Sequence, residues 1–121
     1  LAPDTLIKTK PEVVRAFVEA TAAGWSSYLN GDATPGDASI VQDNPEKTPA
    51  MLAEARAALK AHGLVQSGDA AKSGIGTMTN ARWADFFRMV SAAGAYPATL
   101  DYHKAYTLQF LGPKPQPPAT K

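Results

Sequence analysis

Residues 9–31, TKPEVVRAFVEATAAGWSSYLNG, decide the fold because their start signal, apolar period and stop signal agree. Pro11 suits a first helical position, where its missing N–H is not needed and its φ is already helical. Mostly apolar side chains then recur at steps of three and four residues, which places them on one helix face. The pattern predicts a long helix with one heavy aromatic face. That face consists of Val14, Phe17, Val18, Thr21, Trp25, Tyr28 and Leu29.

The end of this helix is marked by Asn30 and Gly31, residue types that tolerate a left-handed cap. Residues 32–36, DATPG, are residue types that favour a turn, and we expect them not to continue a helix. Burial of each large aromatic side chain of the stripe would contribute on the order of 2 kcal/mol or more. The face therefore needs a partner surface, and we interpret it as structural packing and not as a ligand contact.

The composition bounds the size and class of the protein. A chain of 121 residues fits one small domain. Twelve Lys and Arg balance eleven Asp and Glu without a run of like charge, which argues against nucleic acid or an anionic membrane as a partner. No apolar run approaches the roughly 20 residues of a membrane span, so we expect a soluble chain. Cysteine is absent, which excludes disulfides and thiolate metal sites.

Two further helices have clear start signals. Residues 48–63 place Thr48 at the N-cap and Pro49 at the first position, and they end on a glycine. Residues 79–94 place Thr79 at the N-cap of a helix with a second aromatic face. We expect that face to pack against the first aromatic face or on a lobe outside this chain. It consists of Trp83, Phe86, Phe87, Val90 and Ala93.

Shorter segments connect these helices. Residues 1–8 predict one helical turn, and residues 37–43 predict a short helix that ends before an Asn-Pro pair. Residues 64–78 predict an ordered loop, and residues 101–111 a final short helix or turn. Residues 112–121 contain four prolines and predict polyproline II or disorder. The expected anchors are Leu64, Val65, Ile75 and Met78 in the loop, and Tyr102, Tyr106, Phe110 and Leu111 near the end.

Few residues offer chemistry. His62 and His103 lack a carboxylate or second histidine at metal-site spacing, and His62 is interpreted as a partner of a helix C-terminus. Asp101 lies two residues before His103, a spacing that points side chains apart on a helix. The G-x-G of residues 73–77 lacks the strand and third glycine of a phosphate site and is interpreted as a turn. The residues argue against an enzyme and predict no catalytic residue, no metal and no cofactor.

One combination of residues is more specific than an arbitrary helix. Residues 10–17, KPEVVRAF, followed by Ala20-Thr21 and Gly24-Trp25, resemble a helix in periplasmic solute-binding proteins of ABC importers. The helix belongs to the C-terminal region of the nitrate/sulfonate/taurine and thiamine-pyrimidine-precursor group. Three further pieces follow in the same order, so the resemblance covers nearly everything from residue 5 to 111. These pieces are Asn44-Pro45 before a capped helix, Gly74-x-Gly76 before Ala81-Arg82-Trp83, and YTLQFL at residues 106–111.

The resemblance implies a mainly α fold of four or five helices, like the C-terminal helical region of a two-lobed α/β binding protein. It divides the chain into a helical segment, residues 1–111, and a Pro-rich tail, residues 112–121. It implies a periplasmic protein that captures a small solute by lobe closure and delivers it to ABC importer membrane subunits. The lobes and most ligand-contacting positions of that family precede this region. The solute and the ligand-binding residues are therefore unassigned, and we expect a fragment or part of a longer polypeptide.

Two alternatives stay open. The chain could be a free-standing helical module that presents an apolar groove to a peptide or partner helix. An enzyme of the thiamine-precursor type would need a histidine- or cysteine-bearing site that this segment does not offer. If the faces of Trp25 and Trp83 evolved against an absent lobe, we expect the isolated chain to expose an apolar patch and to self-associate or stay loosely packed.

Overall fold

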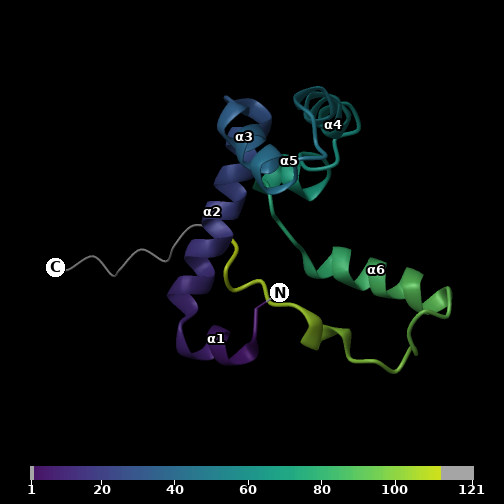
Figure 1. Cartoon of the computed structure of the whole chain (residues 1–121). Coiled ribbons are helices and arrows are strands. Elements are labelled where there is room, and N and C mark those ends of the chain that lie inside the picture. Colours follow the sequence, from purple (N-terminus) through teal and green to yellow (C-terminus); the bar gives the residue numbers. More distant parts are fainter. Residues whose placement is uncertain (1, 113–121) are drawn as a thin grey trace. The chain divides into compact units, whose positions relative to one another are not determined.

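The computed structural model describes residues 2–112, and these residues form helices and no strand (Figure 1). The prediction of a mainly α fold is confirmed. Residues 2–112 form six α-helices, whereas four or five were expected. Two of the six helices are short. The long helices are α2 (Pro11–Asn30), α3 (Thr34–Asp43), α4 (Pro49–Ala61) and α6 (Asn80–Ala92); the short ones are α1 (Asp4–Thr9) and α5 (Asp69–Ser73), and η1 (Tyr102–Ala105) is a 3-10 turn.

The chain divides into two compact units. The first unit, Leu1–Thr77, holds α1 to α5, and the second unit, Met78–Lys121, holds α6 and η1. The predicted packing of the α6 aromatic face on the α2 face concerns both units and stays a prediction. The division into a helical segment and a Pro-rich tail also stays a prediction. The expectation of polyproline II in the tail falls on residues 113–121, which lie outside the described residues.

Helix α2 begins and ends where the sequence indicates. Pro11 is the first residue of the helix and Glu12 follows in the first turn, near the positive end of the helix dipole. At the other end the N–H of Gly31 donates to the carbonyl of Ser27 at 2.8 Å. The expected left-handed cap is wrong, because Gly31 has φ −111° and the chain turns at once into the next helix.

Helix α3 begins at Thr34, so the prediction that residues 32–36 form only a turn is wrong. The reason is a local hydrogen bond to Asp32, just before the helix, whose signal the Pro-Gly pair obscures. The Oδ1 atom of Asp32 accepts a hydrogen bond from the N–H of Thr34 at 2.9 Å, and Pro35 fits the first turn. Hydrogen bonds from the side chain and backbone of Thr34 lower the pKa of Asp32. The helix ends before Asn44, as expected for a residue that precedes proline.

Helix α4 has the predicted cap, since Oγ1 of Thr48 accepts a hydrogen bond from the N–H of Met51 at 3.3 Å. The segment after α4 is not the continuous loop that was predicted. Helix α5 forms there between Gly68 and Gly74, whose φ values are 62° and 95°. A five-residue helix shows no sustained apolar period, which is why the sequence pattern missed it. Leu64 is exposed, so its predicted role as an anchor is also wrong.

Few apolar side chains among residues 2–112 are buried. Leu29 is the most buried large side chain, with 2% of its surface exposed. Two predicted members of the α2 stripe are uncovered instead, because Phe17 is 73% exposed and Trp25 is 39% exposed. The partner surface that this stripe needs is therefore not complete within residues 2–112. The buried apolar side chains are Val14, Leu29, Ala33, Leu52 and Phe110.

Candidate functional site

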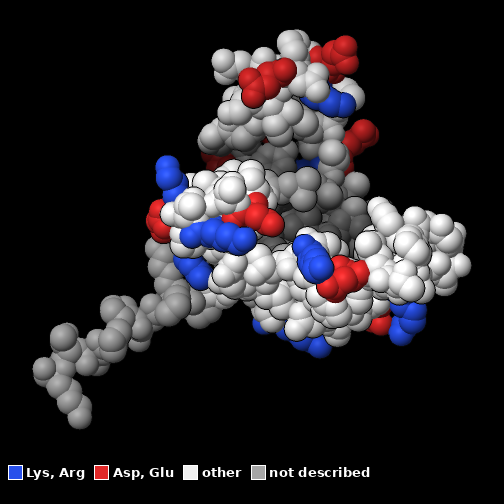
Figure 2. All heavy atoms as spheres, turned by 90° about the horizontal axis from the view of Figure 1, so that it is seen from below, with Lys and Arg blue, Asp and Glu red and all other residues white. Residues whose placement is uncertain are grey.

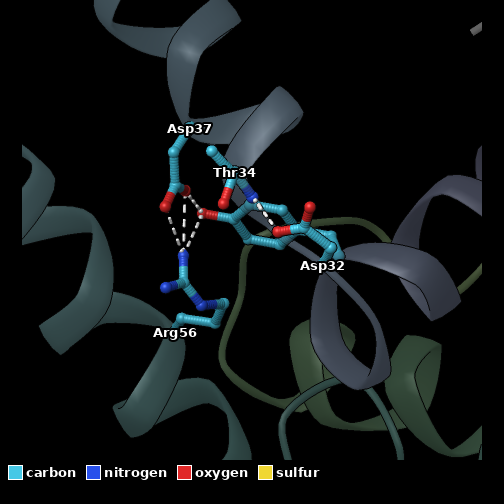
Figure 3. Close-up of polar contacts among 5 residues, drawn as sticks. Asp32, Thr34, Asp37 and Arg56 are labelled. Carbon is cyan, nitrogen blue, oxygen red and sulfur yellow. Dashed lines mark hydrogen bonds and ion pairs between the residues drawn. The ribbon is translucent and has the colours of Figure 1, made fainter.

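A polar cluster joins three helices of the first unit: Tyr28 of α2, Asp37 of α3 and Arg56 of α4. The hydroxyl of Tyr28 donates to Oδ1 of Asp37 at 2.7 Å. One guanidinium nitrogen of Arg56 donates to both carboxylate oxygens of Asp37, at 2.9 and 2.8 Å. The guanidinium carbon also lies 5.2 Å from the centre of the Tyr28 ring, in reach of a cation–π interaction. Figure 3 shows Asp37 and Arg56 pointing toward one another from their helices.

The cluster acts as a clamp between helices. The hydrogen bond from Tyr28 lowers the pKa of Asp37, and the hydrogen bonds and charge of Arg56 lower it further. The same contacts raise the pKa of Arg56. Both side chains therefore stay charged, and the Asp37 carboxylate is occupied by donors. Such a carboxylate is a poor general base, because the donors hold it in its charged form.

We expect acid to weaken the first unit through this clamp. Because the folded pKa of Asp37 lies below its ordinary value of 3.8, the stabilising contribution is complete above that pH and is lost as the pH falls through the folded pKa. Urea unfolding at successively lower pH should show a steeper loss of stability for the wild type than for Asp37→Asn. Asp43→Asn, at the exposed end of the same helix, is the matched control and should keep the wild-type slope. Equal slopes for wild type and Asp37→Asn would contradict the clamp.

An apolar groove lies beside the clamp. This α2–α3 groove has a volume of about 390 Å³, and its lining is apolar apart from two hydroxyl groups. The ring of Trp25 meets the ring of Tyr28 edge-on, with 6.4 Å between centroids. The groove can hold an apolar side chain, but it offers little to orient a polar solute. It is lined by Thr21, Gly24, Trp25, Tyr28, Gly36 and Ile40.

A second groove lies within the second unit, between α6 and the segment that follows it. Trp83 stacks on Tyr106 with ring centres 4.6 Å apart, and Phe87 stacks on Tyr102 at 4.7 Å. The hydroxyl of Tyr106 donates to Oδ1 of Asn80 at 2.8 Å. The predicted anchoring by Tyr102 and Tyr106 is thereby confirmed. This aromatic groove, of about 430 Å³, is lined by Trp83, Phe86, Phe87, Val90, Tyr96, Leu100, Asp101, Tyr102, Lys104 and Ala105.

Of the two histidines, His103 lies near a carboxylate. Its Nδ1 is 3.3 Å from Oδ1 of Asp101, so the expectation that these side chains point apart is wrong. The reason is that Asp101 precedes the 3-10 turn and has non-helical backbone angles. Asp101 also lies 3.7 Å from Nζ of Lys104, and all three side chains are exposed. An exposed carboxylate shared in this way does not hold a buried imidazole as a catalytic relay does. His62 is the C-cap residue of α4, the place predicted for it.

The glycine pair of residues 73–77 forms a turn, as interpreted from the sequence. Gly74 and Gly76 both have positive φ, and the carbonyl of Gly74 accepts hydrogen bonds from the N–H and the hydroxyl of Thr77. The turn leads to the cap of α6, where Oγ1 of Thr79 accepts from the N–H of Arg82 at 3.2 Å. Within residues 2–112 no three His, Asp or Glu side chains are grouped as a metal site requires.

Charged side chains of both signs are interspersed on the face shown in Figure 2. None of the described helices has the length and apolar character that crossing a membrane requires.

Comparisons with known protein families, curated proteins and solved structures found no match to this chain. The description of the site therefore rests on its residues. Sequence reasoning missed the clamp because Asp37 lies nine residues after Tyr28, and Arg56 nineteen residues after Asp37, on three separate helices. Contacts between separate helices leave no pattern of local spacing in the sequence. The aromatic groove was not predicted either, although its lining includes residues of the predicted α6 face and one predicted anchor, Tyr102.

Proposed function

We propose that this chain is the C-terminal helical part of a periplasmic solute-binding protein that delivers a small solute to an ABC importer. The proposal is carried by the four sequence pieces that follow one another in the order of that family. Residues 10–17 form the start of α2, Asn44-Pro45 separates α3 from α4, and the Gly74-x-Gly76 turn precedes the cap of α6. The last piece, residues 106–111, follows η1.

The distribution of apolar side chains also supports the proposal. Large apolar residues are exposed on both long aromatic helices, with Phe17 on α2 and Phe86 and Met89 on α6. Monomeric proteins usually keep contiguous apolar patches to a few hundred Å². Exposed side chains of this kind are expected where helices pack on a part of a larger protein. This support is independent of the sequence pieces, because it comes from burial and not from residue identity.

The proposed activity is binding and release, without covalent chemistry. In the parent protein two lobes close around the solute and then present it to the membrane subunits of the importer. The solute belongs to the range that this family covers: nitrate, sulfonates, taurine, aromatic acids or pyrimidines. The helical part described here supports the lobes and contributes no catalytic residue, metal or cofactor. Ligand-contacting residues are not assigned to it, because most of them precede this region in the family.

A thermal-shift screen of the full-length parent protein tests this function. One of the five solute classes should raise the melting temperature, since a ligand at about 100 times its dissociation constant adds roughly 2.7 kcal/mol of stability. The isolated chain of 121 residues is the matched control and should show no shift with the same solute. A parent protein that responds to none of these solutes would overturn the proposal, as would solute binding by the isolated chain.

A second candidate function is a free-standing helical module that binds a peptide or partner helix. The observation in its favour is the pair of apolar grooves, one in each unit, of about 390 and 430 Å³. Apolar grooves between helices are a common means of holding amphipathic or extended peptides. The two candidates differ in the behaviour of the isolated chain. A free-standing module should be monomeric and melt cooperatively, whereas a part of a larger protein should self-associate or stay loosely packed.

A further inference from the structure

We propose that the aromatic groove of the second unit binds the chain's own Pro-rich tail, residues 113–121, PKPQPPATK. The groove lies in the second unit, and the tail follows Gly112 directly along the chain. The inference concerns a binding site within this chain and does not depend on the proposed transport function. It rests on the chemistry of the groove walls, on the sequence of the tail and on the length of chain that joins them.

The walls of the groove have the chemistry that proline-rich segments bind. Its lining includes five aromatic residues from α6 and the segment after it. Aromatic-lined grooves accept Pro-x-x-P segments in the extended polyproline II form, because flat rings pack against pyrrolidine rings and the ligand loses little conformational entropy. The tail supplies this pattern at Pro115-Gln116-Pro117-Pro118. The five aromatic residues are Trp83, Phe86, Phe87, Tyr96 and Tyr102.

The described residues leave part of the groove lining open. Phe86 is 51% exposed, and Tyr96 and Leu100 are also exposed, although all three line the groove. Three lining residues, Trp83, Phe87 and Tyr102, are held in ring stacks, Trp83 on Tyr106 and Phe87 on Tyr102. Stacked rings beside uncovered apolar side chains favour binding, because the occupant gains apolar contacts while the groove itself needs little reordering.

The tail is long enough to reach the groove. Tyr106 lies at the groove through its stack on Trp83. Residues 107–112 can carry the chain at most about 22 Å away from that point. The nine residues of the tail span about 28 Å as polyproline II, so they can return. A tether of this length holds the tail at an effective concentration on the order of millimolar, so even a weak contact is occupied.

The two charged residues at the groove offset each other, so apolar contacts should dominate the binding of the tail. Asp101 and Lys104 both line the groove, and their charged groups lie 3.7 Å apart. Because these opposite charges sit side by side, the edge of the groove attracts neither sign strongly. The tail carries Lys114 and Lys121, whose charges should contribute little. Occupancy should therefore depend weakly on salt concentration, unlike binding that rests on ion pairs.

The indole N–H resonances of the full chain test the proposal, since Trp25 and Trp83 are its two tryptophans. The double variant Pro115→Ala/Pro118→Ala should shift the Trp83 resonance and leave the Trp25 resonance in place. Trp25 lies in the first unit and serves as an internal control. Pro3→Ala is the matched proline control and should move neither resonance relative to wild type. An unchanged Trp83 resonance in the double variant would overturn the proposal.

A synthetic peptide of residues 113–121 completes the test. Added to the Pro115→Ala/Pro118→Ala chain, it should return the Trp83 resonance toward the wild-type position. Phe86→Ala in that chain should weaken peptide binding about tenfold, as loss of a central aromatic contact does. Met89→Ala, at another exposed position of α6 that lies outside the groove lining, should leave peptide binding unchanged. Equal effects of both substitutions would overturn the assignment of the groove.

A wild-type Trp83 resonance that depends on protein concentration would assign the groove to the tail of a second copy and overturn the intrachain contact.

Discussion

Leu29→Ala should lower the unfolding free energy of the first unit by about 2–5 kcal/mol, whereas Trp25→Ala should lower it by much less. Leu29 is 2% exposed, so its truncation leaves a cavity that the surrounding helices cannot fill. Trp25 is 39% exposed at the α2–α3 groove, so its truncation removes a wall that solvent already reaches. Urea unfolding followed by circular dichroism measures both changes. Phe17→Ala, at a position 73% exposed, is the control and should have the smallest effect.

The same variants bear on the proposed origin of the chain. In a self-sufficient domain Trp25→Ala would cost about 3–5 kcal/mol, as loss of a buried tryptophan does. In a part of a larger protein it should cost less and should also reduce self-association, because an exposed apolar ring is removed. Sedimentation at several protein concentrations measures that association. A monomeric, cooperatively melting wild type with a costly Trp25→Ala would favour the free-standing module over the transport proposal.

Gly36→Ala should destabilise the first unit, although alanine is the better helix former. A Cβ atom at this position would lie 3.0 and 3.2 Å from two ring carbons of Tyr28. Tyr28 would have to give by a few tenths of an ångström, which would strain the hydrogen bond from its hydroxyl to Asp37. Overpacking of this kind costs about 1–3 kcal/mol, against a gain of roughly 0.5–1 kcal/mol in helix propensity. The cost of overpacking should exceed the gain in helix propensity. Urea unfolding measures the net change in the free energy of unfolding.

Gly24→Ala is the matched control for this substitution. Gly24 lies within α2 and lines the same groove, but a Cβ atom there would meet nothing within 4 Å. The substitution should therefore stabilise the first unit by about 0.5–1 kcal/mol, through helix propensity alone. The two glycine variants should thus differ in sign. A stabilising Gly36→Ala would show that Tyr28 yields without cost and that the clamp is not rigid.

Helix boundaries were the most predictable part of the fold, because their signals act within a few residues. The side chains of Thr48 and Thr79 each accept a hydrogen bond from an N–H three residues later, which is the interaction their sequence pattern indicates. Pro11 starts α2 for an equally local reason. The start of α3 was not predicted because the Pro-Gly pair indicates a turn, whereas the side chain of Asp32 accepts a hydrogen bond from the first residue of the helix, Thr34.

Burial was less predictable than secondary structure. The apolar period of α2 correctly indicated a stripe with Leu29 at its buried end, but it could not show how much of the stripe other helices cover. Phe17 lies on that stripe and is exposed, since coverage depends on tertiary contacts that periodicity does not encode. Tyr102 and Tyr106 were predicted as anchors, and both stack on rings of α6, but the groove beside them was not predicted. The clamp depends on three helices at once and was not foreseen.

Glycine is required at three positions of the first unit for two different reasons, small volume at one and a positive φ at the others. Gly36 is needed for its small volume, because the ring of Tyr28 occupies the space of a side chain. Gly68 and Gly74, which flank α5, have open space around them, and their constraint is a positive φ. A mirror-image amino acid adopts that backbone region without strain. The turns around α5 therefore select chirality and not size, so a D-alanine at either position would preserve a turn that L-alanine would strain.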